Sequence, residues 1–333
     1  MYKKRYVVLF LVCWGIVTAS GQQDPMFTSY QFNSLIFNPA YAGSNEHLTL
    51  NLIHRQQWLG FDGAPSTQSL IAHSPLKNER VGLGISLMND KIGPTNTFNA
   101  AGSYAYRMLV GKKKNMKLSL GLQASVANWR GDWSDVTVEH ASDPSFQQNF
   151  SRWMPNFGAG AYLSSKRFYA GMGIPRLLEN DLRQAKNDVV DFYGKTYRHL
   201  YTSLGGIFPF DGDQVVFRPS LLLKSSGLLS SFKKDGKTQN IGAPTALNVD
   251  ASFFFRQTFW VGATYRTAIQ AQKSSNDSAD LWFAWYLRNG LRLGASYDFT
   301  LSKLQKSSGN SFEVMVGYEF DIKVKQVASP RYF

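Results

Sequence analysis

The residues that could carry enzyme chemistry in this chain are spaced in a way that builds no recognisable catalytic or metal site. The chain has five histidines: His47, His54, His73, His140 and His199. None of their separations matches the His-x-x-x-His spacing that places two imidazoles beside one metal ion. No serine stands in the Gly-x-Ser-x-Gly turn that exposes a hydrolase nucleophile. We therefore predict no catalytic residue and no metal ion, and we expect a protein that is not an enzyme.

A pair of glycines gives the only hint of a cofactor, and its context argues against one. Gly158 and Gly160 resemble the start of a dinucleotide-binding fingerprint, which must be followed by a helix. The residues that follow alternate like a strand instead. We interpret the two glycines as positions of close packing inside a β-strand, and we predict no cofactor.

The N-terminus has the organisation of an export signal. Three cations at positions 3–5 precede an apolar stretch over residues 6–17, and small residues then lead to a predicted cleavage site before Gln22. The stretch is too short to span a membrane well, because a spanning helix needs about 20 apolar residues. The single cysteine, Cys13, lies within it. We predict that residues 1–21 are removed and that the mature chain has neither a disulfide nor a reactive thiol.

The charge of the chain is strongly positive, and its basic residues are spread along the sequence. The formal net charge is +13, from 36 lysines and arginines against 23 acidic residues. Such a balance suits an anionic surface, but the basic residues are scattered among the predicted strands and loops. We expect contact with the head groups of membrane lipid or with an acidic protein, and no nucleic-acid partner.

From residue 48 onward the apolar residues recur with a period of two, which is the pattern of β-strands. In segment 311–323, Phe312 lies on an apolar face and Glu313 on a polar one, and Leu293 and Arg292 divide in the same way. We expect the apolar face to meet lipid and the polar face to turn inward. The fourteen predicted strands are 48–58, 66–74, 80–88, 97–109, 117–130, 152–165, 167–176, 199–209, 214–224, 245–256, 258–268, 280–288, 291–302 and 311–323.

The predicted connections alternate strictly between short turns and long loops. The long ones are 59–65, 89–96, 131–151, 177–198, 225–244, 268–279 and 302–310. Outer-membrane barrels have short periplasmic turns and long extracellular loops, and a bilayer excludes open sheet edges. We therefore predict an all-β, multi-pass transmembrane antiparallel β-barrel of about 14 strands in the outer membrane of a Gram-negative cell. Aromatic residues expected in its two interfacial girdles include Tyr104, Tyr106, Trp129, Trp153 and Trp282.

Two segments fall outside the predicted barrel, which covers residues 48–323. Residues 22–47 are rich in aromatic residues, asparagine and proline, and they are predicted either to plug the lumen from the periplasm or to form a docking arm there. Residues 324–333 form a short basic tail on the periplasmic side. Both segments are candidate partner-binding regions, because they contain more aromatic residues than a flexible linker would.

Three short motifs single out candidate residues. The first is Asn38, Pro39, Ala40, Tyr41, Ala42 and Gly43; the second is Arg55, Gln56, Gln57 and Trp58; the third closes the chain with Ser329, Pro330, Arg331, Tyr332 and Phe333. Proline fixes φ and glycine permits a tight turn of the backbone. The first motif is therefore predicted to form a turn where the N-terminal segment enters the barrel. In the second, Arg55 and Trp58 could stack on each other or anchor near the membrane interface. The first two motifs serve either folding or partner contact.

Together these motifs resemble the PorP/SprF family of type IX secretion system membrane proteins. The resemblance extends over the whole mature chain and implies an outer-membrane barrel in a Bacteroidetes-type bacterium. It also implies one of two roles: work with the periplasmic secretion and gliding apparatus, including a peptidoglycan-binding partner, or export and surface attachment of a large adhesin through its C-terminal sorting domain. The alternative function is a passive porin or small-solute transporter, because fourteen strands could enclose a conducting lumen.

Overall fold

The computed structural model describes most of the predicted barrel and the segment before it. The described residues are 24–45, 47–77, 79–111, 115–133, 149–180, 182, 196–210, 214–227, 231–234, 237–240, 245–269, 275–302 and 309–320. The predicted signal peptide, the tail 324–333 and the candidate residues Pro330, Arg331, Tyr332 and Phe333 lie outside them.

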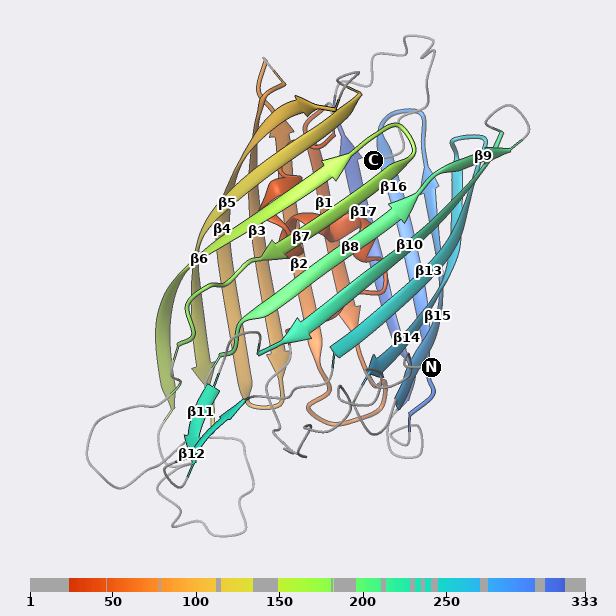
Figure 1. The fold of residues 1–333 in the computed structure, drawn as a ribbon. Coiled ribbons are helices and arrows are strands. Elements are labelled where there is room, and N and C mark those ends of the chain that lie inside the picture. The colour runs from red at the N-terminus through yellow and green to blue at the C-terminus, as the bar shows by residue number, and fades with distance from the viewer. Residues whose placement is uncertain are drawn as a thin grey trace, which may run out of the picture.

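The chain folds into a closed antiparallel barrel of fourteen strands (Figure 1). The strands of the ring are β1 (Thr49–Gln56), β2 (Ser66–Pro75), β3 (Val81–Ile92), β4 (Thr95–Val110), β5 (Met116–Gly131), β6 (Phe150–Ser164), β7 (Phe168–Ile174), β8 (His199–Gly206), β10 (Val215–Ser226), β13 (Thr245–Phe255), β14 (Phe259–Ile269), β15 (Ser275–Tyr286), β16 (Leu291–Thr300) and β17 (Ser311–Glu319). The first and last strands pair along their length, from Thr49 opposite Glu319 to Gln56 opposite Phe312. This closure confirms the predicted barrel, and it leaves no open edge.

Three further strands lie beside this ring. β9 (Phe208–Phe210) continues β8 beyond Ile207 and pairs with the start of β10. β11 (Ser231–Lys234) and β12 (Lys237–Asn240) form a separate hairpin between β10 and β13. Among the described residues, no helix is both long enough and apolar enough to cross a membrane.

The alternation of side chains along each strand divides the barrel into an apolar outside and a mostly polar inside. Leu122, Ile85 and Leu281 keep 65%, 59% and 58% of their surface exposed on the outer wall. The predicted facing of β16 is confirmed, because Leu293 is 37% exposed whereas Arg292 is 5% exposed. The apolar face therefore meets lipid, and Arg292 turns into the lumen.

The predicted long loop over residues 89–96 is wrong. β3 continues to Ile92 and β4 begins at Thr95, so only Gly93 and Pro94 connect them. Gly93 adopts a φ of +54°, and a two-residue hairpin favours such a left-handed residue because its twist matches that of the strands. Short and long connections consequently do not alternate at this position.

Two of the predicted girdle aromatics lie inside the barrel. Trp129 and Trp282 are 5% and 3% exposed, whereas Tyr104, Tyr106 and Trp153 remain on the outer surface. Trp282 follows Asp280 by two residues and so shares its inward face. Its indole Nε1 donates to Asp250 Oδ2 over 2.8 Å, which satisfies the polar edge of the ring inside the lumen.

The two ends of the barrel differ in their connections. β2 and β3, β6 and β7, and β15 and β16 are joined by tight connections at one end, here called the short-turn end. The opposite end, here called the long-loop end, carries the connections between β5 and β6, β7 and β8, and β10 and β13. Both the start of β1 and the end of β17 lie at the short-turn end.

Candidate functional site in the barrel lumen

The segment before β1 lies inside the barrel, where it forms a plug of residues 24–45 (red in Figure 1). Its helical turns are η1 (Tyr30–Asn33), α1 (Ser34–Phe37) and η2 (Pro39–Tyr41). Leu35, Ala40 and Ala42 are fully buried. Helical pieces this short are unstable alone, so the surrounding wall must hold them. The described residues 24–45 of this segment therefore lie inside the barrel.

The motif that begins at Asn38 forms the last turn of the plug. The Asn38 side chain accepts a hydrogen bond from the Ala40 amide over 3.0 Å, which caps η2. Its Nδ2 atom donates to the carbonyl of Ala161 on β6 over 3.0 Å. Pro39 occupies the first turn of η2. A backbone N–H at that position would have no partner within the helix, so proline costs no hydrogen bond there. One asparagine therefore both shapes the turn and attaches it to the wall.

A row of glycines on the wall makes room for this turn. A Cβ atom added to Gly82 would lie 2.0 Å from the Ala42 carbonyl oxygen, and one added to Gly121 would lie 2.2 Å from the Ala40 nitrogen. Similar clashes with Asn38 and Phe37 would arise at Gly160, at 2.1 Å, and at Gly173, at 2.3 Å. Only glycine permits the plug to approach the wall backbone so closely. We call Gly82, Gly121, Gly160 and Gly173 the glycine-lined zone.

Gly43, near the end of the plug, lies against the same wall. It adopts a φ of +65°, which an L side chain rarely does, and an added Cβ would lie 2.7 Å from the Gly82 Cα. Arg107 of β4 reaches inward and donates from Nη2 to the carbonyl oxygens of Gly43 and Ala42, the latter over 3.3 Å. Arg107 thus binds backbone carbonyls that the turn leaves free.

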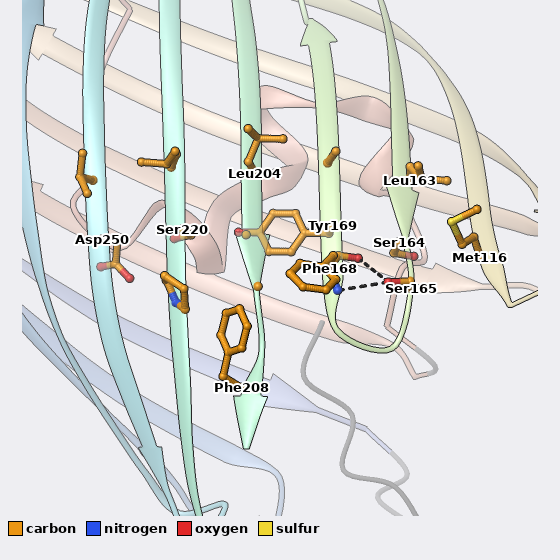
Figure 2. Close-up of a pocket in the computed structure, with 16 residues that line it drawn as sticks. Met116, Leu163, Ser164, Ser165, Phe168, Tyr169, Leu204, Phe208, Ser220 and Asp250 are labelled. Atoms are coloured by element: carbon orange, nitrogen blue, oxygen red, sulfur yellow. Dashed lines mark hydrogen bonds between the residues drawn. The ribbon is translucent and has the colours of Figure 1, made fainter. Parts of the chain in front are cut away.

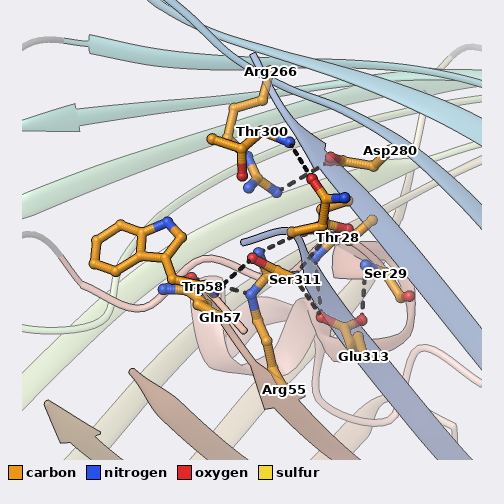
Figure 3. Close-up of polar contacts among 12 residues, drawn as sticks. Thr28, Ser29, Arg55, Gln57, Trp58, Arg266, Asp280, Thr300, Ser311 and Glu313 are labelled. Carbon is orange, nitrogen blue, oxygen red and sulfur yellow. Dashed lines mark hydrogen bonds and ion pairs between the residues drawn. The ribbon is translucent and has the colours of Figure 1, made fainter. Parts of the chain in front are cut away.

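At the long-loop half of the lumen, a buried ionic network holds the start of the plug (Figure 3). Arg55 Nη2 lies 2.6 Å from Asp298 Oδ2, and Nη1 lies 3.5 Å from Glu313 Oε2. Arg55 Nη1 also donates to Thr28 Oγ1 over 2.8 Å. The Glu313 carboxylate accepts the backbone N–H groups of Thr28 and Ser29 over 3.1 and 3.0 Å. We call Arg55, Asp298 and Glu313 the charged zone.

The rest of the Arg55 motif lies just beyond the end of β1. Gln57 Oε1 accepts a hydrogen bond from Arg55 Nε over 3.2 Å. Trp58 has a φ of +47°, and its ring centroid lies 6.4 Å from that of Phe61. Figure 3 shows its indole turned away from the Arg55 guanidinium. Arg55 therefore serves the buried carboxylates, and Gln57 orients it.

Between the two zones, aromatic side chains fill the lumen. The ring of Phe32 lies 4.9 Å from Trp260 and 5.9 Å from Trp282, both in edge-to-face geometry. The Arg292 guanidinium lies 4.8 Å from the Phe32 ring centroid. Asn51 of β1 donates to the Phe32 carbonyl over 2.7 Å. Such contacts between rings and cations add to the burial of the plug.

Asp24, the first described residue, fixes the direction of the plug. Its carboxylate pairs with Arg176 and accepts from the Tyr201 hydroxyl over 2.9 Å. Its carbonyl accepts from Lys224 Nζ over 2.6 Å, and His199 Nδ1 lies 3.4 Å from its carboxylate. These partners come from the ends of β7, β8 and β10 at the long-loop end. The plug therefore crosses the lumen from the long-loop end to the short-turn end, where β1 begins.

The structure gathers the candidate residues into two separate places. Asn38, Pro39, Ala40, Tyr41 and Gly43 lie at the glycine-lined zone, and Arg55, Gln57 and Trp58 lie at or beside the charged zone. Within the described part of the chain, no three His, Cys, Asp or Glu side chains gather closely enough to hold a metal ion.

Strand alternation predicted that Glu313 faces inward, but the sequence did not indicate its partner, and it did not single out Arg107. A cation on an inward strand position is the signal that could have indicated Arg107, because such a charge needs a lumenal partner.

Comparison with known proteins gives one family. The model of the type IX secretion system membrane protein PorP/SprF family matches residues 19–318. No curated protein matches the sequence.

Solved outer-membrane barrels are similar in architecture. A Pseudomonas aeruginosa FadL homologue is 14% identical, with 86% of this chain and 94% of that chain covered and a TM-score of 0.49. The Acinetobacter baumannii outer membrane protein Omp33 is 10% identical, with 82% and 99% covered and a TM-score of 0.45.

Proposed function

Because the chain belongs to the PorP/SprF family of type IX secretion system membrane proteins, we propose that it is a non-enzymatic component that works by binding, with its lumen closed. In this proposal the barrel is an anchor in the outer membrane. It either holds periplasmic components of the secretion and gliding machinery, including a peptidoglycan-binding protein, or supports export and surface attachment of a large adhesin.

The plug is the observation that supports this proposal. A passive porin needs a continuous aqueous channel, whereas here residues 24–45 occupy the lumen. The plug is held at Asp24, Thr28, Asn38 and Gly43, so its attachments are distributed along its length. Buried polar groups that are hydrogen-bonded in this way are costly to separate. Binding surfaces are then expected outside the lumen.

The ends of the barrel supply those surfaces in the proposal. With the short-turn end in the periplasm, β17 delivers the tail 324–333 to that side, where it would meet a periplasmic partner. The basic residues Lys325 and Arg331 in the tail suit an acidic partner surface. The connections at the long-loop end would face outward and contact an exported protein, because variable loops on a rigid scaffold commonly carry recognition.

Deletion of the gene tests the proposal. We expect loss of surface delivery of an exported adhesin, or loss of the assembled periplasmic machinery, while uptake of small solutes is unchanged. Complementation with a chain that ends after Gln326 should restore an inserted barrel but recover less partner in affinity purification. A deletion that alters only solute permeability would support the porin alternative instead. A truncated chain that fails to insert would make the tail an assembly signal.

A further inference from the structure

A trough crosses the lipid-facing surface of β7, β8 and β10 near the short-turn end. Small residues on the outward face form its floor: Ala170, Gly206 and Pro219 line it. Their outward direction follows from strand alternation, since Ser220, next to Pro219, is 7% exposed and faces the lumen. The trough has a volume of about 620 Å³, within the range of about 300–1,000 Å³ typical of pockets that hold small molecules.

Large apolar side chains form two sides of the trough. On the long-loop side, Leu221 stands in register between Leu204 and Val249, and the three are 38–46% exposed. At the short-turn side, Phe208 and Phe168 lie with ring centroids 5.8 Å apart. Figure 2 shows these strands with the plug behind them, and the inward-facing Ser220 and Asp250 also contribute to the lining. Its chemistry fits an acyl chain.

Two basic residues adjoin one end of the trough in the sequence. Ser164 and Ser165 line it, and the next two residues, Lys166 and Arg167, are exposed in the turn between β6 and β7. The turn is held closed by Phe168, whose N–H donates to Ser165 Oγ over 3.1 Å and whose carbonyl accepts from the Ser165 N–H over 2.8 Å. Two exposed cations therefore follow directly on the two serines that line this end of the trough.

We propose that this trough binds one anionic glycerophospholipid. One acyl chain lies between the apolar sides, and the phosphate contacts Lys166 and Arg167. A lipid is the occupant that fits because the trough lies on the lipid-facing wall of an outer-membrane barrel. Basic residues at the membrane surface favour anionic head groups, with each cation contributing separately. The site is independent of the secretion partners proposed above.

Native mass spectrometry of the intact barrel in mild detergent tests the site. Phosphatidylglycerol and phosphatidylcholine with the same acyl chains are the two probes. We expect phosphatidylglycerol to bind with one tight equivalent. The double substitution Lys166→Ala with Arg167→Ala should weaken it by about 10- to 30-fold, because two surface cations are removed. Ala170→Trp, which fills the trough from its floor, should weaken both lipids.

Matched controls separate the site from general effects. Lys77→Ala with Arg288→Ala removes two exposed cations from other turns at the same end, and Ala295→Trp enlarges an outward alanine on β16. Both controls should bind phosphatidylglycerol as the wild type does. The proposal is overturned if the two probes bind equally to the wild type, or if each trough variant binds phosphatidylglycerol as well as its control. Heat-dependent migration on gels verifies that every variant is a folded barrel.

Discussion

The glycine-lined zone and the charged zone hold the same plug by opposite means. In the glycine-lined zone the wall has no side chains, so the plug lies directly against the wall backbone, and the fit is steric. The charged zone places full charges in the lumen, where Arg55 is 2% and Glu313 is 1% exposed. An added side chain destabilises a close steric fit, whereas loss of one charge destabilises a buried ion pair. The two zones should therefore respond to different kinds of substitution.

The largest effect is expected in the charged zone. Arg55→Ala leaves the Asp298 and Glu313 carboxylates buried without their cation, which should lower the free energy of unfolding by about 3–5 kcal/mol. Urea titration of the barrel refolded into lipid vesicles measures this. Adding Asp298→Asn and Glu313→Gln to the same chain should recover part of the loss.

An exposed arginine supplies the control for this substitution. Arg288→Ala, in the turn between β15 and β16, should change the unfolding free energy by no more than about 0.5 kcal/mol. If Arg55→Ala and Arg288→Ala lower the unfolding free energy equally, the charged zone does not stabilise the plug.

In the glycine-lined zone, one added side chain should suffice. Gly121→Val brings a Cβ atom to 2.2 Å from the Ala40 nitrogen, and such overpacking costs about 1–3 kcal/mol. We expect lower unfolding free energy and faster proteolysis within residues 24–45. Gly102→Val is the matched control, because a Cβ added there meets nothing within 4 Å. The steric account fails if the two valine variants behave alike.

A single hydroxyl between the zones gives the smallest effect. Tyr30 is 2% exposed, and its hydroxyl lies 2.6 Å from Ser220 Oγ. Tyr30→Phe should cost about 0.5–1.5 kcal/mol, the usual net value of one hydrogen bond. Tyr106→Phe on the outer wall is the control and should be nearly neutral. A neutral Tyr30→Phe would show that the middle of the plug is held by ring packing alone.

Local pattern was enough to predict the barrel, because facing follows from alternation within each strand. Leu293 and Arg292 could be assigned to opposite faces without any knowledge of their neighbours. The same logic identified Gly160 as a position of close packing, and Asn38 now supplies the group that approaches it, since an added Cβ would lie 2.1 Å from its Oδ1 atom.

The contacts between distant residues were not predictable in this way. Arg55 and Glu313 are 258 positions apart in the sequence, and only closure of the barrel brings them together. Trp282 was misplaced because aromatic type was weighed above strand alternation. The predicted loop over residues 89–96 is a two-residue turn, and the glycine at position 93 is the local signal that favours such a hairpin.

Closure of the lumen by the plug is the central claim, and single-channel conductance in planar lipid bilayers tests it most directly. The wild-type barrel should insert without a steady open current. The double substitution Arg55→Ala with Arg107→Ala, which removes attachments at both ends of the plug, should produce open events of a barrel-sized pore. A steady wild-type current equal to that of the double variant would contradict the account, because the lumen would then conduct with the plug attached.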